Sequence, residues 1–193
     1  MFDQLKYFLF KKKRNRYLKQ MYSAVDPWSS RASLDVLTKK IIEVLQGQKF
    51  TSCLDVGCGE GLYAPLLKQF SDAYLGIDVV VPATSEFKKM DFDEVPRLNK
   101  KFDLIVFNFV MDYLGFQDHP RLFTANLYSF VQQCVLPGAA VLIFNPVYKT
   151  ETWDRVQKYQ FLLETFGFET LKRELVSTGD MQVAFLHMKF KTR

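Results

Sequence analysis

The sequence has few of the residues that bind transition metals. It contains two histidines, His119 and His187, which lie far apart, and three cysteines that form no Cys-x-x-Cys pair. Zinc and similar ions need clustered His and Cys ligands at short spacings. We therefore expect no metal site. An odd number of unpaired cysteines also indicates no disulfide framework, and favours a reducing, cytoplasmic location.

Long hydrophobic runs are also absent. No apolar stretch approaches the roughly 18 residues that a membrane-spanning helix requires. The N-terminal segment places the apolar residues 8–10 before the basic run 11–16, the reverse of a secretory signal, and no small-residue cleavage site follows. With 193 residues, 48% of them hydrophobic and 24% charged, the chain is expected to form one globular core.

Acidic residues are scarce in residues 1–20. This segment holds seven of the 26 Lys and Arg residues and one of the 21 acidic residues, which leaves 19 basic and 20 acidic residues elsewhere. Large apolar residues adjoin these lysines, as in helices that make peripheral contact with anionic membranes. Two other interpretations stay open: an ordinary N-terminal helix with its lysines in water, and a segment that binds RNA.

Beyond residue 50, short apolar runs alternate with amphipathic segments. Strands are expected at residues 51–57, 73–81, 86–92, 102–110, 139–145, 168–178 and 182–192, and helices at 62–70, 121–136 and 151–166. The alternation predicts an α/β fold with a Rossmann-like, doubly wound sheet of seven mostly parallel strands. An antiparallel hairpin, turning at residues 179–180, is expected to close the sheet.

Two local features refine this prediction. Asp118, followed by Pro120, predicts the start of the helix at 121–136, which is expected to stop at Pro137-Gly138. Only residues 79–85 lie between Asp78 and the next expected strand, fewer than the roughly dozen residues of a usual crossover. The crossover helix is therefore expected to be missing there.

Three glycines, Gly57, Gly59 and Gly61, follow the first expected strand and open a helix. Bare glycine lets a ligand approach the main chain, and a helix N-terminus offers free N–H groups. The spacing differs from the dinucleotide fingerprint, because Leu62 stands where its third glycine would be. With Asp55, the pattern Asp-x-Gly-x-Gly-x-Gly resembles the first motif of class I S-adenosylmethionine-dependent methyltransferases.

This resemblance implies a transferase that uses S-adenosylmethionine, and it gives roles to residues at other strand ends. Asp78 ends the second strand and would accept both ribose hydroxyls. Asp91 would lie near the adenine amino group, with Phe92 against its ring. Asn108 follows the fourth strand and would lie over the methionine moiety. With Asp55, Gly57, Gly59 and Gly61, these residues form the expected cofactor site.

A second stretch is similar to the nodulation-protein N-methyltransferase group, which methylates an amino sugar of a chitooligosaccharide. The matching residues are Asp26, Pro27, Trp28 and Ser33. An aromatic residue and a glutamate expected after the serine are absent, as is a glutamate beside Asn108. The resemblance implies a small-molecule acceptor. Because the N-terminal segment precedes the sheet and is free to cover the strand ends, we expect a helical lid over residues 1–30 and a cofactor-binding domain over residues 31–193.

Trp28 in the lid and Arg31 directly after it are candidates for contact with the cofactor. Trp28 would close over the sulfonium of the cofactor through a cation–π contact, and Arg31 would pair with the carboxylate of the cofactor's methionine moiety. Alternatively, Trp28 packs as a hydrophobic plug, and the Arg31 side chain is exposed to solvent.

An amine acceptor must lose a proton before it is methylated, because an alkylammonium with a pKa near 10 has no lone pair. Asp112, Tyr113 and His119 follow the fourth strand and are the candidate catalytic residues. His119, next to Pro120, has the alternative of starting a helix.

Three functions follow from these patterns. The leading hypothesis is methyl transfer from S-adenosylmethionine to a small molecule, such as an amine of a sugar-derived compound. An RNA methyltransferase that uses its basic N-terminus is the first alternative. A binding module that retains the fold is the second. The electrically balanced body of the chain disfavours an extended nucleic-acid surface.

Overall fold

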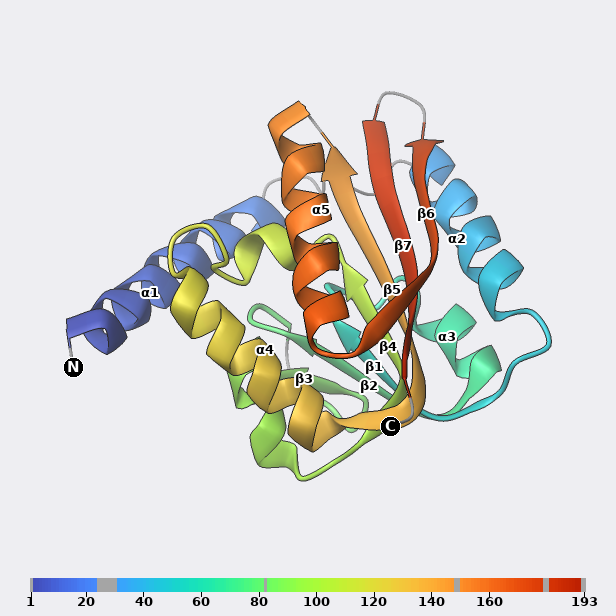
Figure 1. The fold of residues 1–193 in the computed structure, drawn as a ribbon, viewed down its shortest axis with the longest axis horizontal. Helices are drawn as coiled ribbons and strands as arrows, with labels where there is room; N and C mark the ends of the chain where they lie inside the picture. Colours follow the sequence, from blue (N-terminus) through green and yellow to red (C-terminus); the bar gives the residue numbers. More distant parts are fainter. Residues whose placement is uncertain (1, 24–30, 82, 148–149, 179–180, 192–193) are drawn as a thin grey trace.

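The structure is a computed structural model that describes residues 2–23, 31–81, 83–147, 150–178 and 181–191. One sheet runs through the molecule, with helices on both faces (Figure 1). Its strands are β1 (Phe50–Val56), β2 (Ser71–Asp78), β3 (Phe87–Lys89), β4 (Phe102–Asn108), β5 (Val135–Val147), β6 (Phe168–Thr178) and β7 (Met181–Phe190). The helices are α1 (Phe2–Ser23), α2 (Arg31–Leu45), α3 (Ala64–Phe70), α4 (Pro120–Cys134) and α5 (Thr150–Thr165), with short 3-10 helices η1 (Phe92–Leu98) and η2 (Met111–Tyr113).

The sheet confirms the predicted fold class. Its strand order is β3-β2-β1-β4-β5-β7-β6, which makes seven strands. Strand β7 runs antiparallel to both β5 and β6, and the other neighbouring pairs are parallel. The strand order reverses between β1 and β4, and ligands of such sheets bind outside the carboxyl ends of the strands at that point.

Central strand β4 shows why its sequence is almost continuously apolar. Ile105 and Phe107 belong to the core on the side of α4 and α5, whereas Leu104 and Val106 belong to the core on the side of α2 and α3. Successive side chains of a strand point to opposite faces, so a strand covered on both faces has no polar side. This burial holds the strand end, and the loop that follows it, in a fixed place.

The predicted bounds of the helix at 121–136, which is α4, were wrong at both ends. His119, not Asp118, is the residue that precedes α4, and its side chain makes no capping hydrogen bond. The helix stops at Cys134, because Val135 already pairs with Phe102 of β4. Pro137 and Gly138 thus lie inside β5, at the point where its register with β4 shifts.

The missing crossover helix is confirmed for the described part of the connection. Residues 79–81 and 83–86 contain no helix, and β3 pairs with β2 over only Phe87–Lys89. The predicted strand at 86–92 is therefore much shorter, since Phe92 already begins η1. No helix in the described ranges is both long enough and apolar enough to cross a membrane. The three cysteines are free and buried.

Candidate functional site

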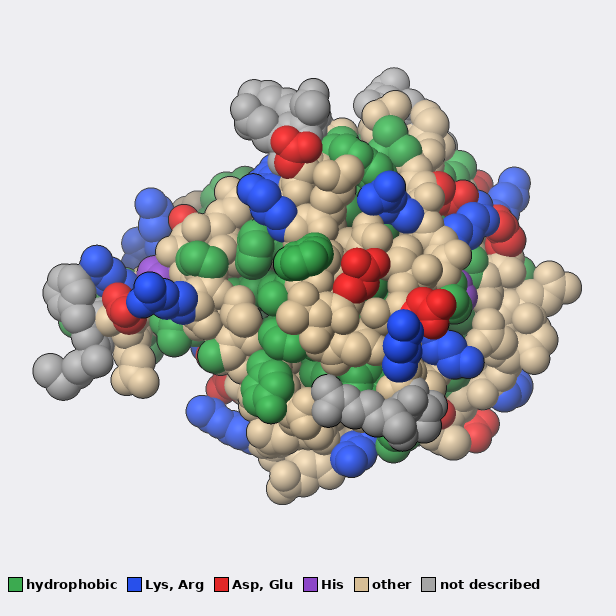
Figure 2. Space-filling model, viewed as in Figure 1, with side chains coloured by type: hydrophobic (Ala, Val, Ile, Leu, Met, Phe, Trp, Pro, Cys, Tyr) green, Lys and Arg blue, Asp and Glu red, His purple; other side chains and the backbone are tan. Residues whose placement is uncertain are grey.

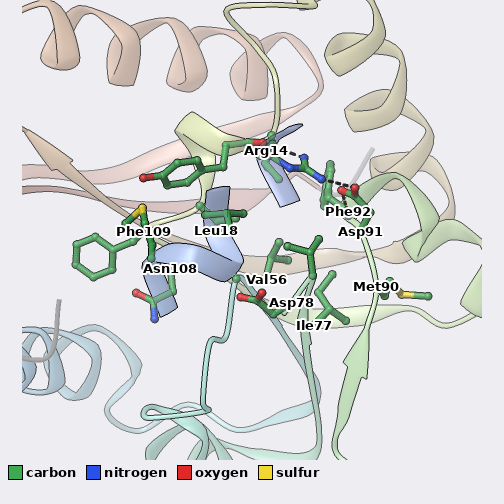
Figure 3. Close-up of a pocket in the computed structure, with 16 residues that line it drawn as sticks. Arg14, Leu18, Val56, Ile77, Asp78, Met90, Asp91, Phe92, Asn108 and Phe109 are labelled. Carbon is green, nitrogen blue, oxygen red and sulfur yellow. Dashed lines mark hydrogen bonds and ion pairs between the residues drawn. The ribbon is translucent and has the colours of Figure 1, made fainter. Parts of the chain in front are cut away.

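A cavity lies at the carboxyl ends of β1, β2 and β4, beside helix α1 (Figure 3). Five residues expected to bind the cofactor line it together: Gly57, Asp78, Asp91, Phe92 and Asn108. The remaining lining residues are Arg14, Leu18, Met21, Val56, Ile77, Val79, Met90, Phe109, Val110, Tyr113 and Leu114.

Two glycines of the loop are required by packing within the protein, which the sequence alone does not show. Gly57 has a φ of +75°, and a Cβ there would lie 2.6 Å from the Val110 Cβ. A Cβ on Gly61, with a φ of +78°, would lie 2.5 Å from the Phe87 ring. Both glycines are therefore required by neighbouring protein atoms and by backbone conformation. Gly57 also lines the cavity, whereas Gly59 and Gly61 do not.

Asp78 is held at the end of β2 by two main-chain donors. Its Oδ2 accepts a hydrogen bond of 3.1 Å from the Gly59 N–H, and its Oδ1 accepts one of 3.0 Å from the Val80 N–H. The residue is 8% exposed and lines the cavity. The carboxylate is thus fixed at the place where the sequence analysis expects ribose hydroxyls to donate.

Asp91 forms a buried ion pair with the N-terminal helix. Its Oδ1 accepts from the Phe92 N–H at 2.9 Å, while Oδ2 pairs with Arg14 and lies 3.2 Å from the Lys11 Nζ. The Asp91 N–H in turn donates to the Glu94 side chain, which completes a capping box at the start of η1. The acid expected near the adenine amino group is therefore also the docking point of α1 (Figure 3).

Asn108 presents an unused acceptor. The residue lines the cavity, and its Oδ1 is buried and has no hydrogen-bond partner among the described residues. A buried oxygen without a donor costs about 1–3 kcal/mol, so a ligand N–H at this place would be stabilising. The next residue, Phe109, has a φ of +54°, which is rare for an aromatic residue and turns the chain away at the strand end.

Asp55 lies beneath the loop and outside the cavity lining. It is fully buried and accepts a hydrogen bond of 2.9 Å from the Tyr74 hydroxyl, while its Oδ1 has no partner among the described residues. Burial, with a smaller contribution from the nearby Asp78 charge, raises the pKa of this carboxyl to about 7.

Asp112 belongs to a polar cluster that joins η2, β5 and α5. Tyr159 donates its hydroxyl to Oδ1 at 2.8 Å, and Asn145 donates its amide to Oδ2 at 3.2 Å. Arg155 lies 3.6 Å from Oδ1. The Asn145 Oδ1 is buried and has no partner among the described residues. The cluster therefore holds the Asp112 carboxylate in one orientation and keeps it one-fifth exposed.

The other two candidate catalytic residues are placed differently. Tyr113 lines the cavity, its carbonyl accepts from Arg14 at 3.0 Å, and burial raises the pKa of its phenol. His119 does not line the cavity. Its ring packs edge-on against Tyr7 and Phe10 of α1, with ring centres 5.5 and 5.2 Å apart. This placement favours the interpretation of His119 as a helix-start residue.

Two candidate lid residues lie beyond what the structure describes. Trp28 is outside the described residues. Arg31 begins α2, but its side chain is outside the description as well.

Sequence analysis predicted a helical lid over residues 1–30 but did not identify the residues of α1 that line the cavity. Arg14, Leu18 and Met21 line it at spacings of four and three residues, which place side chains on one helix face. That spacing was available in the sequence, but nothing local distinguishes Arg14 from the other cations of the segment. In the described part of the chain, no group of three His, Cys, Asp or Glu side chains is placed to hold a metal ion.

Comparison with protein families gives one match that covers most of the chain. A family model described as "Methyltransferase domain" matches residues 5–165. The matched range includes most of α1, the glycine loop and all residues that line the cavity. A search of curated proteins found no match.

Solved structures with this fold include several methyltransferases. The N-methyltransferase NodS from Bradyrhizobium japonicum WM9, in complex with S-adenosyl-L-homocysteine, superposes with a TM-score of 0.71 at 15% identity, covering 93% of this chain and 99% of that chain. The Burkholderia thailandensis 1,6-didemethyltoxoflavin-N1-methyltransferase also gives 0.71, at 16% identity, over 97% and 90% of the two chains. Magnesium protoporphyrin IX methyltransferase from Synechocystis PCC 6803, with bound S-adenosylmethionine, gives 0.58 at 12% identity, over 92% and 97%.

Proposed function

The chain belongs to the methyltransferase domain family, and we propose that it transfers a methyl group from S-adenosylmethionine to a small-molecule acceptor. One observation carries the proposal: the cavity brings Asp78, Asp91 and Asn108 together at the strand ends where the family resemblance expects the cofactor. The NodS structure contains S-adenosyl-L-homocysteine and the magnesium protoporphyrin IX methyltransferase structure contains S-adenosylmethionine, which supports S-adenosylmethionine as the cofactor.

The residues of the cavity fit the polar groups of this cofactor. Asp78 offers a carboxylate, preset by main-chain N–H groups, for two ribose hydroxyls. Asp91 and Phe92 offer an acceptor and an apolar ring for adenine. The unpartnered Asn108 Oδ1 offers an acceptor for the methionine ammonium. When bound, S-adenosylmethionine supplies the methyl group, which it carries on a sulfonium sulfur.

For the acceptor, we propose an amine, with a sugar-derived amine as the specific candidate. NodS is an N-methyltransferase, and the 1,6-didemethyltoxoflavin enzyme was crystallised with that small molecule bound. Asp112 would orient the amine or take its proton, because Tyr159, Asn145 and Arg155 hold its carboxylate in place. Tyr113, the residue after Asp112, lines the cavity, which Asp112 itself does not, and would face the acceptor.

We further propose that residues 1–30 act as a lid on a cofactor-binding domain formed by residues 31–193. Support comes from α1, whose Arg14, Leu18 and Met21 form one wall of the cavity. A lid would exclude water and position the reactants, which are the main requirements of a displacement reaction. The alternatives of an RNA methyltransferase or a binding module rest on the basic N-terminal segment alone.

Transfer of label tests the proposed function. The full chain is incubated with methyl-labelled S-adenosylmethionine and a panel of amines, amino sugars, hydroxylated small molecules and RNA. Label on a small amine, with matching formation of S-adenosylhomocysteine, is the expected result. Label on RNA would indicate an RNA methyltransferase instead. Cofactor binding without transfer to any acceptor class would support the binding module instead.

A further inference from the structure

Helix α1 has one face that is docked on the rest of the molecule. Its Arg14 is buried in the ion pair with Asp91, and the Tyr7 hydroxyl accepts a hydrogen bond of 3.2 Å from the Asn126 amide. The Phe10 ring packs on His119 and beside Gly115. This inner face therefore makes the contacts that dock α1 on the rest of the protein and line the cavity.

The opposite face of α1 exposes three large apolar side chains close together. Leu5 is 56% exposed, Phe8 51% and Leu9 55%. Residues three and four positions apart lie on the same side of a helix, so these three form one apolar cluster. Scattered exposed apolar residues are normal on protein surfaces, but a contiguous cluster marks an interaction site.

Cations continue the same face toward the C-terminal half of α1. Lys12, Lys13, Arg16 and Lys19 are exposed there, and the Lys12 Nζ lies 4.6 Å from the centre of the Phe8 ring. Asp3 is the only acidic residue of the helix. Lys and Arg side chains gather around the end of the molecule that α1 forms, which projects with the N-terminus outermost (Figures 1 and 2).

We propose that the outer face of α1, defined by Leu5, Phe8, Leu9 and the four cations that follow, binds the surface of an anionic lipid bilayer. The apolar cluster would enter the boundary between headgroups and acyl chains, while the cations contact lipid phosphates. Long Lys and Arg side chains reach headgroups while their stems stay in apolar surroundings. The helix would thus lie tilted, with its apolar N-terminal half deeper.

Charge and chemistry favour this partner over two others. A second copy of the chain would bring like-charged faces together, with Asp3 alone to compensate. A nucleic acid would use the cations but not the aliphatic side chains of Leu5 and Leu9. The bilayer uses both parts of the face. Binding there leaves Arg14 and Leu18 on the inner face, so contact with lipid is compatible with a docked helix.

Flotation of the full chain with vesicles tests this proposal. Vesicles of phosphatidylcholine mixed with an equal proportion of phosphatidylglycerol are compared with phosphatidylcholine alone. We expect the chain to float with the anionic vesicles at low salt and to remain at the bottom with the neutral ones, and salt should weaken the binding. A chain that stays at the bottom with both kinds of vesicle overturns the proposal.

Two sets of substitutions assign the binding to the outer face. Leu5→Ser with Phe8→Ser and Leu9→Ser removes the apolar cluster, and Lys12→Gln with Lys13→Gln and Arg16→Gln removes charge while keeping good helix-forming residues. Each set should reduce binding by about ten-fold or more. Phe161→Ser is the matched control, because Phe161 is 71% exposed but lies on α5. An equal loss in the control overturns the proposal.

Competing partners give distinct outcomes in the same assay. Displacement of the chain from anionic vesicles by polyuridylate RNA at physiological salt would indicate that the outer face binds a nucleic acid and not a lipid bilayer. If the chain does not bind vesicles but forms concentration-dependent dimers that the Ser substitutions abolish, the partner of the outer face is a second copy of the chain. The result is independent of the proposed methyl transfer, because none of the substituted residues lines the cavity.

Discussion

Arg14 and Asp91 form an ion pair in which each side chain is 7% exposed or less, although they are 77 positions apart. The pair joins the N-terminal helix to the end of β3, at the acid that the family resemblance places near adenine. Arg14 also donates to the Tyr113 carbonyl, next to the Asp112 cluster. Docking of α1 is thereby linked both to Asp91 and to the η2 segment that carries Asp112.

The first prediction concerns this pair. Arg14→Gln removes a hydrogen bond to a charged group, which is worth about 1.5–3 kcal/mol, and should loosen α1 from the sheet. Hydrogen exchange should show amides of residues 2–23 exchanging about ten-fold faster or more, with β4 and β5 unaffected. Arg16→Gln, on the exposed side of the same helix, is the control. Unchanged exchange in Arg14→Gln would mean that the pair does not hold the helix.

The second prediction concerns the glycine loop. Gly57→Ala should destabilise the fold by roughly 1–3 kcal/mol beyond backbone strain, because its Cβ would overlap Val110. Gly47→Ala is a matched control, since Gly47 has a similar φ of +76° but no atom within 4 Å of its Cβ. Thermal or urea unfolding of both variants measures the difference. Equal destabilisation would leave backbone strain as the sole reason for Gly57.

Strand ends were predictable from sequence, and helix docking was not. Asp78 and Asn108 are the last residues of apolar strands, and parallel strands bring their carboxyl ends to one edge, so local patterns were enough. Arg14 looks like any cation of a basic segment until tertiary contacts bury it. The Asp112 cluster likewise depends on Asn145 and Tyr159, which are 33 and 47 positions away. Such contacts depend on packing between α5 and the sheet.

The third prediction addresses the acceptor side. Asp112→Asn keeps the shape of the side chain but removes its charge, and should lower the methylation rate by about a hundred-fold, with cofactor affinity nearly unchanged. Asp118→Asn, an exposed neighbour in the same connection, is the control. Single-turnover kinetics and calorimetry separate rate from affinity. A parental rate in Asp112→Asn would remove this carboxylate from the reaction and direct attention to Tyr113.

The fourth prediction is a pH dependence of stability. Burial raises the pKa of Asp55 from 3.8 to about 7, so between these values the folded protein retains a proton that the unfolded chain releases. The resulting stabilisation is complete below the unfolded pKa and is lost as the pH rises through about 7. Urea unfolding across this range should show a slope that Asp55→Asn flattens. Asp72→Asn, exposed on β2, should leave the slope in place.

The central claim is that S-adenosylmethionine binds at the strand ends, and calorimetry of two β2 variants tests it most directly. Asp78 lies at the carboxyl end of β2 in the cavity, and Asp72 is exposed at the opposite end of the same strand. Asp78→Ala should weaken binding of S-adenosylmethionine by about 1.5–3 kcal/mol, whereas Asp72→Ala should bind like the parent. Equal affinity in the parent and in a folded Asp78→Ala variant would contradict this placement, and a parent that binds no S-adenosylmethionine would contradict the whole account.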